Sequence, residues 1–162
     1  MSHIITVDTL EQLIPELKKQ GKLVLVGGCF DILHPGHTQF LQSAKDTGKT
    51  LLVMLESDEA ITKSKGPGRP IHSQKERAQK LLEIPSVDYV LLLPTLKTNE
   101  DYYEMTNRIQ PDIIAVTKSD PMLSHKQKQV EKVGGRVIEV IERIPNHSTT
   151  NLINTRNTNI HI

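Results

Sequence analysis

Five short apolar runs, each separated from the next by a segment with helical spacing, constrain the fold of this 162-residue chain. Strands that alternate with helices in this way build βαβ units, whose strands are parallel. Each run is almost wholly apolar, as expected for strands that helices cover on both faces. We therefore predict a single-domain, doubly wound (Rossmann-like) α/β fold with a parallel five-stranded sheet. The predicted strands are residues 22–27, 50–55, 87–93, 112–116 and 136–141.

The remaining segments fill the spaces between these runs without a linker or an internal repeat. One domain is expected over residues 1–155, followed by a flexible tail over residues 156–162. Residues 62–70 are rich in Gly, Pro and Lys and are predicted as a basic loop. The lead-in at residues 3–7 is short enough for an edge strand and is not counted among the five.

Composition excludes several classes of protein. The 20 Lys and Arg balance the 19 Asp and Glu, so no basic footprint points to nucleic acid. A single cysteine rules out an internal disulfide framework and a cysteine-rich zinc site. No apolar run approaches the roughly 20 residues that span a bilayer, and the first twenty residues resemble no signal peptide. We expect a cytoplasmic protein with a small ligand and no membrane partner.

The first predicted strand ends in glycines and leads to two histidines at a helix start. Gly27 and Gly28 lack a Cβ, so a ligand can approach the backbone closely there. His34 and His37 flank Pro-Gly at the helix entrance, where unpaired N–H groups and the helix dipole favour a phosphate. An ordinary turn with exposed histidines is the alternative interpretation. We favour a phosphate site, because every element of the stretch agrees with it.

These residues also carry a resemblance to a known family. His34-Pro35-Gly36-His37 resembles the HxGH motif of the nucleotidyltransferase superfamily, and residues 28–31 resemble the G-(T/C)-F-D strand end of that superfamily. Near the C-terminus, Arg143 and the Ser-Thr-Thr run at residues 148–150 resemble the second signature of the cytidylyltransferase-like branch. Over residues 9–153 the chain is most similar to the adenylyltransferase domain of ADP-heptose synthesis, and it also resembles the glycerol-3-phosphate cytidylyltransferases.

The resemblance implies transfer of a nucleoside monophosphate, with AMP favoured, from a nucleoside triphosphate (NTP) to a phosphorylated sugar or a similar small molecule. Pyrophosphate leaves, Mg²⁺ accompanies the NTP, and no residue is assigned as a metal ligand. His34, His37 and Lys65 are the implied catalytic residues, and Arg77 would bind the acceptor. A homodimer is expected, since relatives in this branch often dimerise. The implied nucleotide-binding residues are Gly28, Cys29, Phe30, Asp31, Lys63, Asp120, Arg143, Ser148, Thr149 and Thr150.

One segment departs from the family pattern. The family often has Gly-Gly-Asp or Gly-Asp-Asp after the fourth strand, whereas residues 117–120 read Thr-Lys-Ser-Asp. The change leaves the nucleotide and the acceptor open. Alternatives are a cytidylyltransferase for a polyol phosphate such as glycerol 3-phosphate, a non-catalytic nucleotide-binding module, and a hydrolase that uses His34 or His37.

Overall fold

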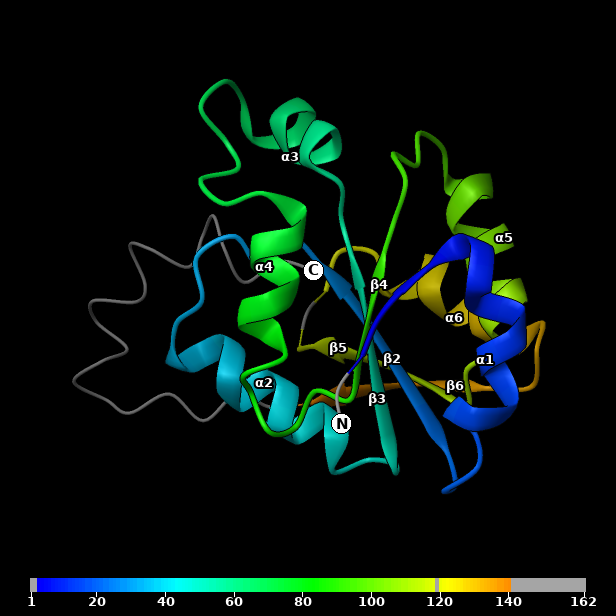
Figure 1. Cartoon of the computed structure of the whole chain (residues 1–162). Helices are drawn as coiled ribbons and strands as arrows, with labels where there is room; N and C mark the ends of the chain where they lie inside the picture. Colours follow the sequence, from blue (N-terminus) through cyan, green and yellow to red (C-terminus); the bar gives the residue numbers. More distant parts are fainter. Residues whose placement is uncertain (1–2, 119, 141–162) are drawn as a thin grey trace.

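A six-stranded parallel sheet forms the centre of the protein in a computed structural model, which describes residues 3–118 and 120–140 (Figure 1). The strand order is β1-β4-β3-β2-β5-β6, and every pair of neighbours is parallel. The predicted doubly wound α/β fold is confirmed. The strands are β1 (His3–Thr6), β2 (Leu23–Gly28), β3 (Thr50–Leu55), β4 (Tyr89–Leu92), β5 (Ile113–Thr117) and β6 (Arg136–Val140).

Two helical layers cover the sheet. Helices α2 and α4 lie on one face, and α1, α5 and α6 lie on the other (Figure 1). A short helix, α3, lies beyond the carboxyl end of β3, at the top of Figure 1. The helices are α1 (Leu10–Leu17), α2 (Pro35–Lys45), α3 (Asp58–Lys65), α4 (Gln74–Leu81), α5 (Asn99–Ile109) and α6 (Leu123–Glu131), with a 3₁₀ turn at Val7–Thr9.

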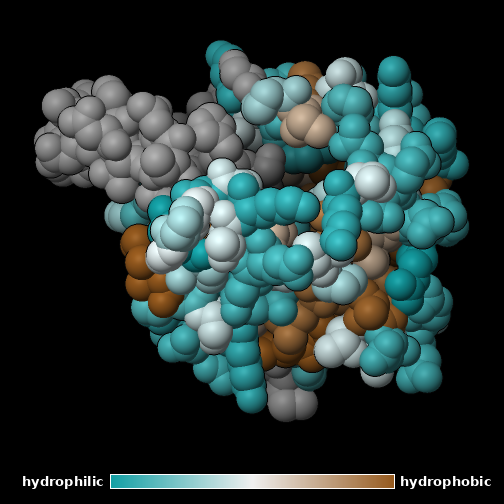
Figure 2. Space-filling model, turned by 90° about the horizontal axis from the view of Figure 1, so that it is seen from above, coloured by the Kyte–Doolittle hydropathy of each residue, from teal (hydrophilic) through white to brown (hydrophobic). Residues whose placement is uncertain are grey.

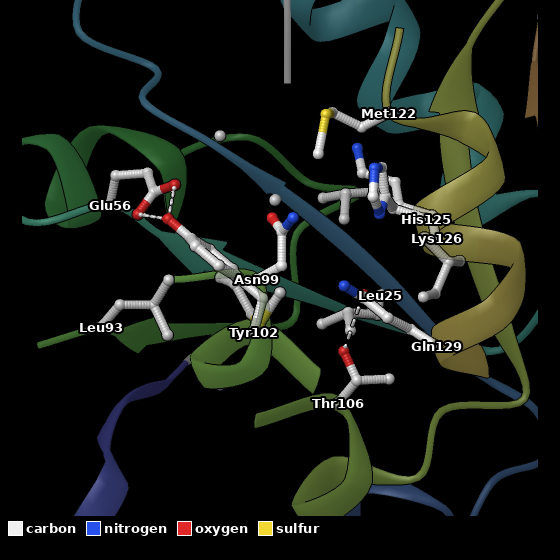
Figure 3. A pocket seen from close by; sticks show the side chains of 15 residues that line it. Leu25, Glu56, Leu93, Asn99, Tyr102, Thr106, Met122, His125, Lys126 and Gln129 are labelled. Atoms are coloured by element: carbon white, nitrogen blue, oxygen red, sulfur yellow. Dashed lines mark hydrogen bonds between the residues drawn. The ribbon is translucent and has the colours of Figure 1, made fainter. Parts of the chain in front are cut away.

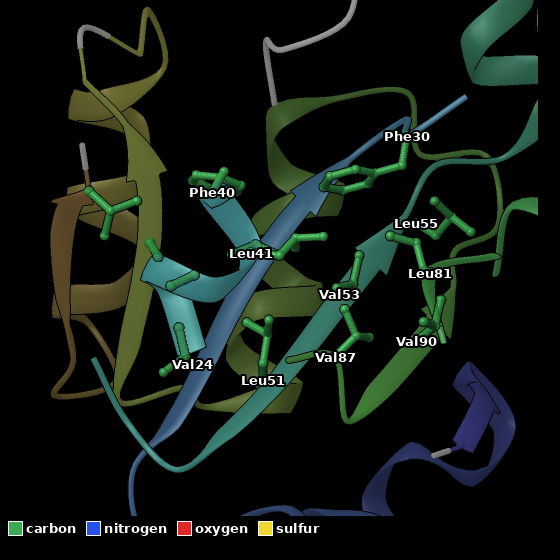
Figure 4. Close-up of a cluster of buried hydrophobic side chains, with 14 of the residues drawn as sticks. Val24, Phe30, Phe40, Leu41, Leu51, Val53, Leu55, Leu81, Val87 and Val90 are labelled. Atoms are coloured by element: carbon green, nitrogen blue, oxygen red, sulfur yellow. The ribbon is translucent and has the colours of Figure 1, made fainter. Parts of the chain in front are cut away.

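Alternation along the buried strands builds two separate cores. In β2, Val24 and Val26 point toward α2 and α4, whereas Leu23 and Leu25 point toward α1, α5 and α6. Figure 4 shows the first core, in which Phe40 and Leu41 of α2 pack onto this face of the sheet. Because both faces of each central strand are buried, the strands appear in the sequence as continuous apolar runs. These runs made the strands predictable.

The predicted strand number was too low by one. The lead-in at residues 3–7 contains β1, which pairs with β4 in the register His3↔Tyr89 to Thr6↔Leu92. Of its residues only Ile5 is buried, because β1 lies at the edge of the sheet. Four residues with one buried side chain carry too little periodicity to distinguish a strand from a loop.

The basic loop predicted at residues 62–70 begins later than expected. Helix α3 continues to Lys65, so Lys63 and Lys65 stand in its last turn and only the following residues form a loop. Gly66, with a φ of 97°, ends the helix as its C-cap. The Lys and Ser residues of this turn are compatible with a helix end, and composition alone did not reveal the boundary.

The strand order places a binding crevice at the carboxyl end of β2. From β2 the chain moves outward through β3 to β4, and then returns to β5 on the other side of β2. The helices that follow β2 and β5 therefore lie on opposite faces of the sheet. The point between β2 and β5 at which the strand order reverses is called the switch point, and ligands of open α/β sheets bind there.

Candidate active site

The two histidines close the first turn of α2 by capping each other. His34 is the N-cap, and its Nδ1 accepts a hydrogen bond from the backbone N–H of Gly36 at 3.1 Å. His37 Nδ1 accepts from the backbone N–H of His34 at 3.3 Å. The arrangement is a capping box in which histidines replace the usual Ser/Thr and Glu/Gln. It fixes both rings at the N-terminus of α2, with their centroids 3.9 Å apart.

These hydrogen bonds also assign the tautomer of each ring. A neutral imidazole that accepts through Nδ1 carries its proton on Nε2. Both His34 and His37 therefore carry a proton on Nε2, the Nε2 of His34 is buried, and each ring is held by the backbone in a fixed orientation. Fixed donors of this kind stabilise negative charge on a phosphoryl oxygen.

Phe30 supports His37 from the protein interior. Its backbone has a φ of 47°, in the left-handed region that a bulky residue seldom adopts. The conformation turns the ring into the core, where it meets the His37 ring edge-on at a centroid distance of 5.4 Å. A buried Phe30 side chain holds the histidine in place, so any contact with a nucleotide must come from its backbone.

Asp31 organises the loop between α3 and α4. Its buried carboxylate accepts from the backbone N–H groups of Ile71 and His72 and from Nε of Arg69 at 2.9 Å. Burial alone would raise the pKa of Asp31, but these three donors outweigh it and lower the pKa. The predicted contact of Asp31 with the nucleotide stays a prediction; its observed contacts are with this loop.

Replacing Asp31 should therefore loosen the loop in a pH-dependent way. Asp31→Asn loses the negative charge and turns an amide donor toward Arg69, so we expect a loss of about 1–3 kcal/mol at neutral pH. The folded-state pKa is lowered, so the stabilisation is present above the unfolded pKa of about 3.9 and lost below it. The stability gap between wild type and variant should close as pH falls below 4 in denaturant titrations. A constant gap would contradict this role.

Arg77 is buried and makes hydrogen bonds to three separate segments. It has no exposed surface and donates from Nη1 to the carbonyl of Cys29 at 2.8 Å and from Nε to the carbonyl of His72 at 3.0 Å. Its Nη2 forms an ion pair with Asp58 at 2.6 Å. The side chain has no exposed surface in this arrangement, and its predicted contact with an acceptor stays a prediction. Arg77 ties the end of β2 to α3 and to the loop after it.

Two lysines and the carboxylate of Glu56 line a small cavity of about 270 Å³ beside Cys29. Lys63 of α3 and Lys97, which follows β4, both line it. Burial raises the pKa of the Cys29 thiol, although the nearby Lys65 opposes the change. A thiol held protonated is a poor nucleophile, so the lysines, rather than the cysteine, are the groups here that suit an anionic ligand.

A second cavity, of about 260 Å³, opens at the switch point (Figure 3). Strands β2, β3 and β5 form its floor, where Gly27 leaves room because it has no side chain. Helix α5 contributes Asn99 and Tyr102 to one wall, and α6 contributes His125 and Lys126 to the other. The cavity is therefore apolar at its base and polar along its walls, as is usual for small-molecule sites.

Glu56 and Tyr102 form a pair that lines both cavities. The Tyr102 hydroxyl donates to both carboxylate oxygens of Glu56, at 2.8 and 3.0 Å (Figure 3). Burial raises the pKa of Glu56 despite this hydrogen bond, and burial with the adjacent carboxylate raises that of Tyr102. Sequence reasoning missed both residues. The one signal available was an acidic residue directly after a buried strand.

Residues 117–120, which differ from the family pattern, lead into α6. Asp120 is buried and accepts from the backbone N–H of Met122 at 2.6 Å and from Lys126 Nζ at 2.8 Å. These contacts place α6 and orient a lysine that lines the second cavity. A role of Asp120 at the nucleotide stays a prediction.

Several predicted residues lie outside the described ranges. They are Arg143, Ser148, Thr149 and Thr150, together with the predicted domain end at residue 155. The structure thus brings together the glycine end of β2, both histidines, Phe30, Asp31 and the α3 lysines around one end of the sheet.

The face above the strand ends is mostly hydrophilic, with hydrophobic atoms visible between polar side chains (Figure 2). Within residues 3–118 and 120–140, no group of three or more His, Cys, Asp and Glu side chains could hold a metal ion. No helix in those ranges is both long enough and apolar enough to cross a membrane.

Comparison with known proteins gives consistent matches. Residues 25–160 match the family model described as cytidylyltransferase-like. The chain is 37% identical over 156 residues to the bifunctional protein HldE of Syntrophotalea carbinolica, covering 94% of this chain and 30% of that protein. It is 40% identical over 113 residues to HldE of Wolinella succinogenes, covering 69% and 23%. The chain spans less than a third of the length of these relatives.

Solved structures agree with the architecture. A lipopolysaccharide core biosynthesis protein from Thermoplasma volcanium matches with a TM-score of 0.59 and 26% identity, over 77% of this chain and 98% of that one. A pantoate-beta-alanine ligase from Francisella tularensis matches with a TM-score of 0.65 and 13% identity, over 90% and 69%. The second likeness concerns the fold alone.

Proposed function

Because the chain belongs to the cytidylyltransferase-like family, we propose that it transfers a nucleoside monophosphate, with AMP favoured, from an NTP to a phosphorylated sugar or a similar small molecule. An oxygen of the acceptor phosphate attacks the α-phosphorus, and the bond from that phosphorus to the bridging oxygen breaks. The bridging oxygen keeps the electron pair and leaves with pyrophosphate. No side chain has to become a nucleophile in this reaction.

The observation that carries the proposal is the pair of fixed Nε2–H donors at the N-terminus of α2. They stand directly beyond the glycine end of β2, where the helix dipole also favours a phosphate. Charge that develops on the α-phosphoryl oxygens would be stabilised without reorganisation. Lys63 and Lys65, at the end of α3, would neutralise further phosphate charge. Mg²⁺ would arrive with the triphosphate, which suits an ion usually held by phosphates and water.

Nucleotide binding provides the first test. The protein is incubated with ATP or CTP, Mg²⁺ and a panel of sugar and polyol phosphates, and pyrophosphate is measured. The preferred nucleotide at 100 times its dissociation constant should stabilise the fold by about 2.7 kcal/mol, which raises the melting temperature by roughly 5–10 °C for a domain of this size. Faster turnover with CTP would assign the cytidylyltransferase alternative. Nucleotide binding without turnover of any acceptor would make the chain a binding module.

A further inference from the structure

The carboxylate of Glu56 lies between the two cavities. It lines both cavities, its side chain is partly buried, and among residues 3–118 and 120–140 its carboxylate oxygens share a hydrogen bond from the Tyr102 hydroxyl. Each carboxylate oxygen can accept about two hydrogen bonds. A single shared donor therefore leaves accepting capacity directed at the cavities.

We propose that Glu56 determines acceptor specificity, by accepting hydrogen bonds from hydroxyl groups of a polyhydroxylated acceptor body held between α5 and α6. This inference rests on the proposed function and narrows its substrate class. The acceptor's phosphate would lie toward Lys63 and Lys97 in the cavity beside Cys29, and its hydroxylated body would lie in the cavity beside Gly27.

The other groups of the cavity favour hydroxyls over a cationic acceptor. An ammonium group would meet the His125 ring and the Lys126 ammonium, which is paired with Asp120 at 2.8 Å, on the opposite wall. Tyr102 is the one Phe, Tyr or Trp side chain among the described lining residues, so the cavity lacks the aromatic cage that holds quaternary ammonium groups. Asn99 and Gln129 each offer a donor and an acceptor, which complement neutral hydroxyls.

Glu56→Gln tests the inference directly. The substitution preserves shape and removes the charge, so hydrogen bonds from acceptor hydroxyls weaken. We expect the KM for an aldohexose 1-phosphate or glycerol 3-phosphate to rise about ten-fold or more, while the KM for the NTP stays within about two-fold. Glu100→Gln is the matched control, because Glu100 is exposed in the first turn of α5 and does not line either cavity.

Gly27→Ala tests the location of the acceptor body. Gly27 points to the same face as Leu25, toward the cavity. The three atoms nearest to a Cβ there belong to Met54, at 3.7 Å or more, which is ordinary contact. The variant should therefore fold with unchanged or slightly higher stability, and yet raise the acceptor KM several-fold by occupying cavity space.

The acceptor KM values of wild type and variants decide whether Glu56 sets acceptor specificity. A rise in acceptor KM in both variants, with the control unchanged, supports Glu56 as the specificity residue. Unchanged acceptor KM in Glu56→Gln, or a preference of the wild type for ethanolamine phosphate, overturns the inference while pyrophosphate release still supports the proposed function. If no acceptor is turned over, the proposed function fails, and calorimetric binding of aldohexose 1-phosphate to wild type and Glu56→Gln decides the inference: equal affinities, or none, overturn it.

Discussion

His37→Ala is expected to lower turnover by 10²-fold or more, with a much smaller effect on nucleotide affinity. The variant loses an oriented Nε2–H donor, and removal of one preorganised donor to developing negative charge typically costs that much in kcat. The measurement is pyrophosphate release under saturating substrates, with the KM for the NTP determined separately. Unchanged turnover would remove His37 from the mechanism.

Loss of the imidazole also affects the fold, so a second variant is needed. His37 accepts the backbone N–H of His34 and packs against Phe30, and alanine does neither. His37→Gln restores an acceptor at the third position of the helix, where Gln completes ordinary capping boxes. It should therefore recover much of the stability but little of the turnover. His3→Gln, on the edge strand β1, is the matched control: it loses only the stacking of His3 on Tyr89 at 5.0 Å and should leave turnover unchanged.

Arg77→Met is expected to destabilise the protein by about 3–5 kcal/mol. The partly buried carbonyls of Cys29 and His72 would lose their donor, and an unsatisfied buried group costs roughly 1–3 kcal/mol. The ion pair contributes less, since half of the Asp58 side chain is exposed. A domain of this size should then melt roughly 10 °C lower.

Arg136→Met provides the comparison for Arg77. Arg136 is exposed on β6, and such substitutions usually change stability by less than about 0.5 kcal/mol. Similar melting temperatures for the two variants would mean that Arg77 does not hold the end of β2. Because the carbonyl of Cys29 lies in the strand end that precedes the histidines, Arg77→Met should also lower turnover in the fraction that remains folded.

Much of the fold could be predicted because its signals are local or periodic. Central strands buried on both faces appear as apolar runs, and the turn chemistry between them marks the helices. The strand count omitted the edge strand β1, and the end of α3 at Lys65 was misjudged, since a four-residue strand and a polar last helical turn carry weak patterns. The predicted topology was otherwise confirmed by the parallel pairing of β2, β3, β4, β5 and β6.

In the candidate site, too, the contacts between residues near in sequence were predictable, and the contacts between distant residues were not. His34 and His37 are three residues apart, so their reciprocal capping of α2 follows from helix geometry and from the motif itself. The contacts of Asp31 with residues 69–72 join segments about forty positions apart, and the Glu56–Tyr102 hydrogen bond joins residues 46 positions apart. No spacing rule links such pairs, because their proximity depends on which strand ends become neighbours.

The sequence by itself determined the layered α/β architecture and the phosphate-binding strand, turn and helix, since periodicity and helix capping act over a few residues. Only the tertiary structure decided which other side chains lie around this strand, turn and helix, and which of them are buried. Arg77 is buried because α4 packs its inner face against the sheet. Glu56 lines a cavity because α5 places Tyr102 within hydrogen-bond distance of it. The helix faces that meet the sheet, and the gap left between α5 and α6, arise from packing of the whole chain.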